Sequence, residues 1–223
     1  MAEIYGRAYA AAYNASWFEW GGADLTPFLV EVVRAHHPEA ATWLDLCCGP
    51  GHLLQQVDEA GFTATGVDAS PAMIEHARRN APDADVCQAD VLELDLDAAF
   101  DVVSCIGGSV NYFTRKCDFE RLLRRGRRRL APGGWLIFDV NLAPGFEHNA
   151  GRRVAALGDD HAVIVEIGYE PRRRRGRWRI TGFAADGKCY RRYDEEHLLR
   201  AYTRAEIETT LARLGFSYMR YDG

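Results

Sequence analysis

Residues 43–54 read WLDLCCGPGHLL and lead from a buried strand through a glycine turn into a helix. This geometry places backbone N–H groups and a helix N-terminus at the carboxyl end of a parallel strand, where open α/β sheets bind their ligands. The stretch also sets two adjacent cysteines between Asp45 and the Gly-Pro-Gly turn. The loop is therefore a thiol site, a phosphate cradle or a loop for another kind of ligand.

The surrounding sequence repeats the alternation of strand and helix. Helices are expected at residues 24–38, 51–60, 71–80 and 119–130. Further short apolar strands follow the first one along the chain: TATGVDAS, ADVCQAD, FDVVSCIGG and GWLIFDVN. Such alternation implies right-handed crossovers, and it predicts an α/β fold with a Rossmann-like, doubly wound, mostly parallel sheet that has helices on both faces.

The pattern changes after Asn141. The segments HAVIVEIGYE, GRWRITGFAAD and CYRRYDEEHLLRAYT read as three strands joined by short turns, which predicts a small inserted antiparallel sheet over the substrate site. A helix then begins at Thr203, with Glu206 in a capping box, and FSYMRYD reads as one more strand. The expected units are a helical lid at 1–40, a core at 41–141, a cap at 142–203, and the last helix and strand at 204–223.

Composition limits the partners and the compartment of the protein. A net charge of -5 disfavours a general polyanion binder, so no nucleic acid is expected, and the arginine runs RLLRRGRRRL and PRRRRG are interpreted as solvated faces. The six cysteines form no C-x-x-C pair and the histidines lack metal-ligand spacing, so we expect reduced thiols and no metal. Without a signal segment or an apolar run of about 18 residues, no membrane contact is expected and the chain is predicted to be cytoplasmic.

The glycines and acids near the loop discriminate between ligands. A dinucleotide fingerprint fails because Leu54 stands where its third glycine belongs, and no Lys-Ser/Thr pair follows for a P-loop. Asp45 would repel a pyrophosphate but attract a positively charged group. Asp68 ends the second strand, where an acid can accept both ribose hydroxyls, and Asp90 ends the third, where it can accept an adenine amine. The three acids predict a nucleoside ligand with a cationic tail and no phosphate.

These residues resemble the class I S-adenosylmethionine-dependent methyltransferases, most strongly over residues 40–141. The family pattern D/E-x-G-x-G-x-G aligns with Asp45, Cys47, Gly49 and Gly51, with Cys47 where the family usually has a glycine. The resemblance implies S-adenosylmethionine as cofactor and makes the two cysteines small packing residues of its loop. The residues that it assigns to the cofactor are Tyr5, Tyr13, Asp45, Cys47, Gly49, Gly51, Asp68, Ala69, Met73, Asp90, Val91, Cys105, Ile106 and Gly107.

The resemblance also bears on the methyl acceptor. The segment CIGGSVNYF after the fourth strand lacks the Asn/Asp-Pro-Pro-aromatic tetrapeptide of enzymes that methylate nucleic-acid bases. Tyr5, Tyr9 and Tyr13 share one helical face, which either packs on the sheet or forms a lid over the cofactor. A tyrosine lid with an inserted sheet resembles the small-molecule N-methyltransferases that act on amino sugars and related amines. The candidates to face or deprotonate the acceptor are Asn111, Tyr112, His148 and His197.

The leading prediction is methyl transfer to a nitrogen of a small-molecule acceptor by a monomer or homodimer. A small-molecule oxygen acceptor is the runner-up, and the lack of a convincing general base favours the neutral amine over it. Three alternatives stay open. They are an RNA-modifying methyltransferase that uses the arginine runs, a cofactor-binding regulatory protein without turnover, and a nicotinamide dehydrogenase, which Leu54 and Asp45 disfavour.

The end of the sequence carries a separate expectation. Folds of this family finish with two antiparallel-paired strands after the last helix, one of them beside strand five, whereas only FSYMRYD follows here. The segment GWLIFDVN is therefore expected to have an open, association-prone edge. Either the natural protein continues with an apolar strand, or another segment or subunit covers this edge.

Overall fold

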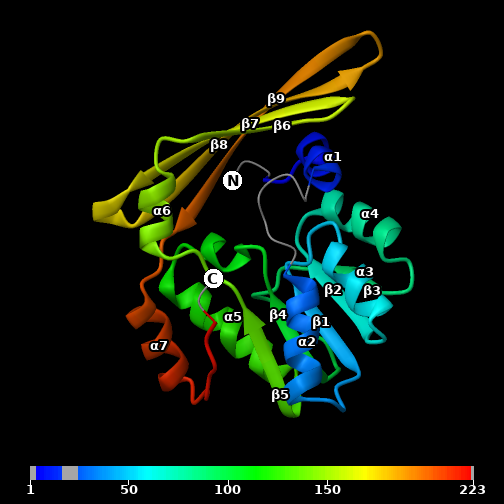
Figure 1. Ribbon diagram of the computed structural model, residues 1–223, viewed down its shortest axis with the longest axis vertical. Helices are drawn as coiled ribbons and strands as arrows, with labels where there is room; N and C mark the ends of the chain where they lie inside the picture. The colour runs from blue at the N-terminus through cyan, green and yellow to red at the C-terminus, as the bar shows by residue number, and fades with distance from the viewer. Residues whose placement is uncertain (1–3, 17–24, 222–223) are drawn as a thin grey trace.

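The computed structural model describes residues 4–16 and 25–221. Its centre is a five-stranded sheet in the order β3-β2-β1-β4-β5, and every neighbouring pair is parallel (Figure 1). This arrangement confirms the predicted Rossmann-like sheet. The strands are β1 (Thr42–Leu46), β2 (Thr63–Asp68), β3 (Asp85–Gln88), β4 (Phe100–Cys105) and β5 (Leu130–Phe138).

Helices cover both faces of the central sheet, since strand side chains alternate between the two faces. Leu44 and Val103 pack with side chains of α5 and α7 on one face, and Trp43 and Val102 pack with α2, α3 and α4 on the other. No helix in the described part of the chain is long and apolar enough to cross a bilayer. The helices are α2 (Thr26–His36), α3 (His52–Glu59), α4 (Pro71–Asn80), α5 (Lys116–Arg128) and α7 (Arg204–Arg213), with a short 3-10 helix η2 (Ser109–Tyr112) after β4.

A second sheet, here called the cap sheet, is antiparallel in the order β6-β7-β8-β9 and stands beyond the carboxyl end of the central sheet (Figure 1). The three predicted strands correspond to β7, β8 and β9. The sequence prediction missed β6 and the helix α6 (Ala143–Asn149) before it, because β6 has only five residues and its sequence, RVAAL, shows no alternation of polar and apolar residues. The strands are β6 (Arg153–Leu157), β7 (His161–Glu170), β8 (Arg175–Asp186) and β9 (Cys189–Arg200).

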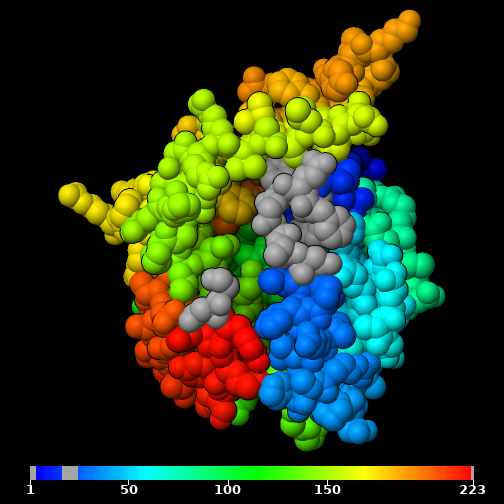
Figure 2. Space-filling view, viewed as in Figure 1, coloured from blue at the N-terminus to red at the C-terminus, as the bar shows by residue number. Residues whose placement is uncertain are grey.

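The first helix, α1 (Arg7–Ala15), lies between the cap sheet and the core (Figure 1). Tyr9 and Ala12 pack among apolar residues of β7 and β8, whereas Ala10 packs against Met73 of α4. The space-filling view shows the surface hollowed between the cap sheet and the core, with residues of the core at the floor of the hollow (Figure 2). The helix α1 therefore bridges the two layers that border this hollow.

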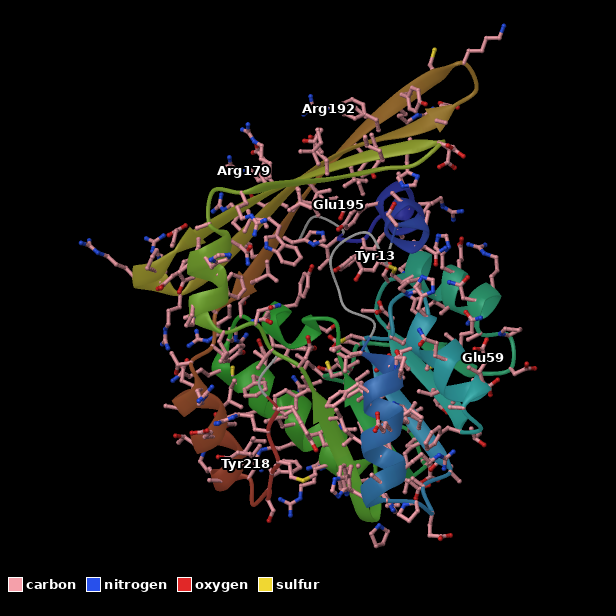
Figure 3. The ribbon with its side chains drawn as sticks, viewed as in Figure 1. Tyr13, Glu59, Arg179, Arg192, Glu195 and Tyr218 are labelled. Atoms are coloured by element: carbon pink, nitrogen blue, oxygen red, sulfur yellow. The ribbon has the colours of Figure 1, made fainter. Side chains whose placement is uncertain are left out.

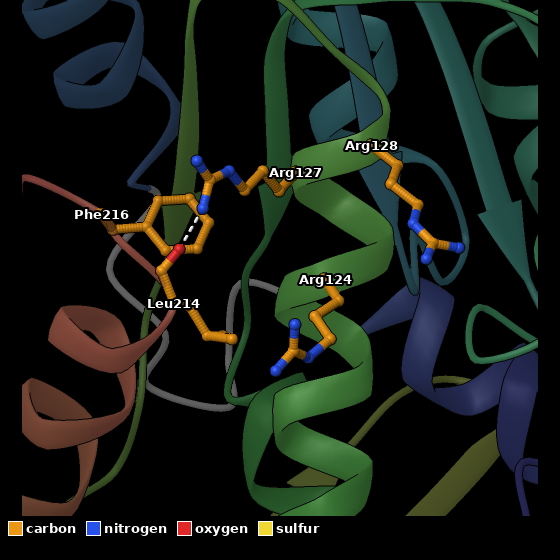
Figure 4. Close-up of a pocket in the computed structure, with 5 residues that line it drawn as sticks. All are labelled: Arg124, Arg127, Arg128, Leu214 and Phe216. Atoms are coloured by element: carbon orange, nitrogen blue, oxygen red, sulfur yellow. Dashed lines mark hydrogen bonds between the residues drawn. The ribbon is translucent and has the colours of Figure 1, made fainter.

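Residues 216–221 after α7 form no strand, contrary to the prediction for FSYMRYD, whose last residue lies outside the described part of the chain. Gly215 adopts φ 73°, and the N–H groups of Gly215 and Phe216 donate to carbonyls in the last turns of α7, which is a Schellman turn. Phe216 then lies against the guanidinium of Arg127, which also donates to the Leu214 carbonyl (Figure 4). Among the strands of the described ranges, β5 consequently pairs with β4 alone.

The arginine run of α5 is only in part the solvated face that the sequence predicted. Arg125 donates from Nε to the Leu92 carbonyl and from Nη1 to the Leu94 carbonyl, both at 3.1 Å. These bonds satisfy carbonyls of an irregular segment between β3 and β4, where no ladder supplies a donor. Arg125 and Arg127 therefore hold neighbouring backbone in place.

Candidate functional site

Asp45 is a buried carboxylate near the carboxyl end of β1. It is 2% exposed, and its Oδ1 accepts a 2.6 Å hydrogen bond from the Ser104 hydroxyl, which in turn accepts from the Trp43 indole N–H at 2.8 Å. Burial raises the pKa of Asp45 to about 7; the Ser104 bond opposes the shift, and the charges of Asp68 and Asp139 add to it. Three carboxylates therefore converge at this edge of the central sheet.

Asp68 and Asp139 are the other two members of this group. Asp68 ends β2 and accepts the Gly49 N–H at 3.0 Å and the Ser70 N–H at 2.8 Å, so it ties the loop after β1 to its own strand. Asp139 follows β5, and both of its oxygens lie 3.0 Å from the Gly108 nitrogen. Burial raises the pKa of both acids. The sequence prediction missed Asp139, although an acid directly after an apolar strand was the same signal that identified Asp68.

The chemistry of this group selects the charge of a ligand. No ion pair between described residues involves Asp45, Asp68 or Asp139, and desolvation disfavours the charged form of each. A cation bound beside them would stabilise their ionised forms, whereas a phosphate would be repelled. Gly49 has φ 53°, and a side chain added there would meet nothing within 4 Å, so the loop backbone is open to a ligand. These residues fit a cofactor that carries a sulfonium and an ammonium group.

The cysteines of the loop serve packing and backbone conformation. Cys47 has φ 60°, a left-handed conformation that is uncommon outside glycine, at the position where the resemblance expects a glycine. Its thiol lies close enough to the thiol of Cys105 that their hydrogen bond, together with burial, raises the pKa of Cys105. Cys48 is buried and packs against Gly66 of β2, where any added side chain would collide with Leu54. The loop therefore has the backbone course that the family pattern predicts.

Aromatic side chains from the N-terminal segment face this edge. The hydroxyl of Tyr5 lies 2.7 Å from that of Tyr112, which lies 2.7 Å from Nδ1 of His197. Nε2 of His197 lies 2.9 Å from Oε2 of Glu195. Tyr13, between the cap sheet and the core in Figure 3, packs edge-on against Tyr5 with ring centroids 5.5 Å apart, and burial raises its pKa, with contributions from Tyr112, Asp68 and Asp139. The structure thus brings Tyr5, Tyr13, Tyr112 and His197 together, as expected for residues of one site.

Two of the predicted acceptor-facing residues lie outside this network. Asn111 is fully buried, and its amide is committed to backbone groups: Nδ2 donates to the carbonyls of Asn141 and Arg200, and Oδ1 accepts the Asn141 N–H. Asn111 therefore links the backbone after β5 to the end of β9, and the prediction that it faces the acceptor is wrong. His148 is exposed in the last turn of α6 and makes no hydrogen bond with this group. Glu195, which completes the network, was missed.

The remaining residues that were predicted to bind the cofactor differ in how accessible they are to a ligand. Asp90 is exposed, and its Oδ1 accepts the Leu92 N–H at 2.8 Å, which leaves its other oxygen open. Gly51, at φ 83°, sits where an added side chain would press on the backbone of α4, so packing alone accounts for it. Met73 lies in the first turn of α4 and Cys105 is the last residue of β4, and both are buried. The others lie on the loops that follow β2, β3 and β4, and they are Ala69, Val91, Ile106 and Gly107.

Comparison with known proteins agrees with this geometry. Residues 44–134 match the model of a methyltransferase domain. The chain is also 29% identical to the dTDP-4-amino-2,3,4,6-tetradeoxy-D-glucose N,N-dimethyltransferase of Saccharopolyspora spinosa, over 93% of this chain and 83% of that protein. The chain is an S-adenosylmethionine-dependent methyltransferase.

The likeness of this methyltransferase to other members extends over most of its length. The dTDP-3-amino-3,6-dideoxy-alpha-D-glucopyranose N,N-dimethyltransferase of Streptomyces fradiae is 26% identical over 85% of this chain and 75% of that protein. The crystal structure of a sugar N-methyltransferase from a Streptoalloteichus species superposes with a TM-score of 0.79 at 28% identity, and covers 96% of this chain and 88% of that one. The methyltransferase domain, the helix α1 and the cap sheet are thus all within the similarity.

The raised pKa of Asp45 predicts that cofactor binding depends on pH. Below about pH 7 this carboxyl is protonated and loses its attraction for a cationic ligand. The affinity for S-adenosylmethionine is therefore expected to rise about tenfold between about pH 6 and about pH 8, as the ionised fraction of this one group rises. Titration calorimetry at several pH values measures this, and the variant Asp45→Asn should bind with a nearly constant affinity. An equal rise in that variant would contradict the assignment to Asp45.

Proposed function

We propose that this methyltransferase transfers the methyl group to the nitrogen of an amino-sugar-like small molecule. The observation that carries the proposal is the extent of similarity to enzymes named as amino-sugar N,N-dimethyltransferases. It covers 93% of this chain, well beyond the methyltransferase domain at 44–134, and so includes the lid and the cap sheet that border the hollow beyond the carboxylates. These are the segments from which an acceptor site would be built.

The carboxyl edge of the sheet supplies the cofactor residues of this proposal. When bound, S-adenosylmethionine supplies a methyl group activated by a positively charged sulfur. Asp68 would accept the ribose hydroxyls, Asp90 the adenine amine, and Asp45 and Asp139 would hold positive charge. The enzyme mainly has to align the acceptor nitrogen with that methyl group and exclude water, so buried aromatic walls and few charged groups suit the task.

An amine acceptor must lose a proton before its nitrogen can attack, and the Tyr5–Tyr112–His197 network supports a route for that proton. The carboxylate of Glu195 only accepts hydrogen bonds, so Nε2–H of neutral His197 donates to it and Nδ1 is left as an acceptor. Tyr112 then donates to Nδ1, and Tyr5 donates to Tyr112. The hydroxyls of Tyr5 and Tyr112 thus both donate in the direction of His197. The oxygen of Tyr5 keeps lone pairs that can accept a proton from the substrate amine.

The proton transfer follows from this order. The acceptor ammonium gives its proton to the oxygen of Tyr5, the Tyr5 proton moves to Tyr112, and the Tyr112 proton moves to Nδ1 of His197, which becomes an imidazolium beside Glu195. Burial raises the pKa of both tyrosines, so they remain neutral hydroxyls that pass a proton on. Tyr5, Tyr112 and His197 are thus the proposed proton carriers for a nitrogen nucleophile.

A paired substrate assay tests the proposed function. The enzyme is incubated with S-adenosylmethionine and either dTDP-3-amino-3,6-dideoxy-glucose or the same nucleotide sugar with a hydroxyl in place of the amine. Mass spectrometry should find one or two added methyl groups on the amino sugar alone. Methylation of the hydroxyl compound would favour the oxygen acceptor, and methylation of neither would count against a nucleotide-linked sugar acceptor.

A further inference from the structure

Glu195 and Glu196 are neighbours in β9 whose side chains lie on opposite faces of the cap sheet. Alternation along the strand directs Glu195 toward the core (Figure 3), on the same face as the buried His197, and directs Glu196 to the exposed outer face. Glu196 is exposed there and pairs with Arg177 at 3.3 Å and Arg179 at 3.8 Å. Glu195 instead has a side chain that is only 10% exposed. The two adjacent glutamates thus differ in burial, with Glu195 facing the core and Glu196 facing solvent.

The carboxylate of Glu195 accepts two hydrogen bonds from the distant N-terminal segment and one from His197, two residues away in β9. Its Oε2 accepts the Tyr5 N–H at 2.8 Å, and its Oε1 accepts the Gly6 N–H at 2.9 Å. Its Oε2 also faces Nε2 of His197 at 2.9 Å. Gly6 is the N-cap residue of α1, whose first turn has no acid and no side-chain cap, so the carboxylate from β9 supplies the negative charge that a helix N-terminus favours.

Tyr5 is held in a conformation that needs support from its neighbours. Its φ of 59° is rare for an aromatic residue and persists only where surrounding contacts fix it. The fixing contacts are the N–H bond to Glu195, a 3.0 Å bond from the Ser70 hydroxyl to the Tyr5 carbonyl, and the hydroxyl contact with Tyr112. One of the two hydrogen bonds that hold the backbone of Tyr5 is therefore made to the same carboxylate that orients His197.

We infer that Glu195 is a positioning residue that holds the N-terminal lid, here residues 4–16, in place as a latch and, through the same carboxylate, sets the ring orientation and tautomer of His197. Closure of the lid and alignment of the Tyr5–Tyr112–His197 route are then one event. The kinetic half of this inference rests on the proposed function, because it requires an amine that loses a proton. The latch itself does not depend on the acceptor.

The substitution Glu195→Gln tests the part that the carboxylate plays at His197. The amide would place its oxygen at the Oε2 position, where the N–H groups of Tyr5 and His197 meet, so it keeps the tautomer but leaves the imidazolium of His197 without its negative partner. With dTDP-3-amino-3,6-dideoxy-glucose as acceptor, kcat is expected to fall about tenfold or more, while KM for this acceptor changes less than twofold. Glu196→Gln, the matched control on the outer face, should leave both constants unchanged. An unchanged kcat in Glu195→Gln would overturn the inference.

Hydrogen exchange tests the latch in the presence of S-adenosylhomocysteine. In Glu195→Ala, the amides of Tyr5 and Gly6 should exchange about tenfold faster than in the wild type, whereas Glu196→Gln should match the wild type. Equal protection in all three proteins would overturn the latch. If the alanine variant does not fold, the nearly isosteric glutamine variant decides, since it too loses one of the two acceptor oxygens. If the wild type methylates no amino sugar, the proposed function fails, and the exchange rates still decide whether Glu195 holds the lid.

Discussion

Replacing Asp68 with alanine is expected to weaken S-adenosylmethionine binding by about 1.5–3 kcal/mol, the usual loss for hydrogen bonds to a charged group. The Asp68 carboxylate is expected to contribute to cofactor binding in two ways. It accepts the Gly49 and Ser70 N–H groups, which sets the loop after β1 against the end of β2, and it is the proposed acceptor for the ribose hydroxyls. Burial disfavours its charged form, so its removal should leave the fold intact.

Calorimetric titration of the variant and the wild type measures this loss. Asp68→Asn is the matched control, since it retains one acceptor oxygen and the shape of the side chain, and it should lose less affinity than the alanine variant. An unchanged dissociation constant in Asp68→Ala would remove the ribose assignment of Asp68.

Substituting Gly51 with alanine is expected to destabilise the fold by about 3 kcal/mol, from left-handed backbone strain plus overpacking. Gly51 has φ 83° at the start of α3, and an added Cβ would lie 2.9 Å from Cα and 3.0 Å from Cβ of Ala77 in α4. Those atoms belong to a packed helix backbone, so they cannot move aside as the end of a flexible side chain can.

The neighbouring Gly49 provides the control for this measurement. It also has a positive φ, 53°, but an added side chain there would meet nothing within 4 Å. Gly49→Ala should therefore cost about 1 kcal/mol, from backbone strain alone. Urea unfolding of both variants gives the two free energies, and equal losses would show that the contact with Ala77 does not decide the effect.

The central sheet was predictable because its signals are local. Each parallel strand is a short apolar run, and each is separated from the next by a helix or a turn that the sequence marks. Asp45 and Asp68 could be assigned to one edge for the same reason, since strands that run in parallel end on the same side of a sheet. Asp139 was equally predictable in principle, and it follows the fifth strand in the same way.

The cap and the proton route could not be predicted in the same detail. Alternation in β9 places Glu195 and His197 on one face, but their partners Tyr5 and Tyr112 come from the N-terminal segment and from η2, and no periodic pattern links such distant residues. The opposite error arose at FSYMRYD, where alternating aromatic residues suggested a strand. Tyr218 is instead 49% exposed, and Phe216 is turned back onto α5 by the Schellman turn at Gly215.

The tie between Tyr5 and Glu195 spans 190 residues and has a consequence for biosynthesis. The helix α1 has nine residues, fewer than the roughly 12–15 that an isolated helix needs, so it cannot hold its shape when it first leaves the ribosome. Its anchoring carboxylate is translated 190 residues later, and closing so long a loop is entropically costly until the core and the cap sheet exist. The helix α1 is therefore translated before the core but ordered only after the cap sheet, and a ribosome-bound chain with a folded core is expected to be inactive until β9 emerges.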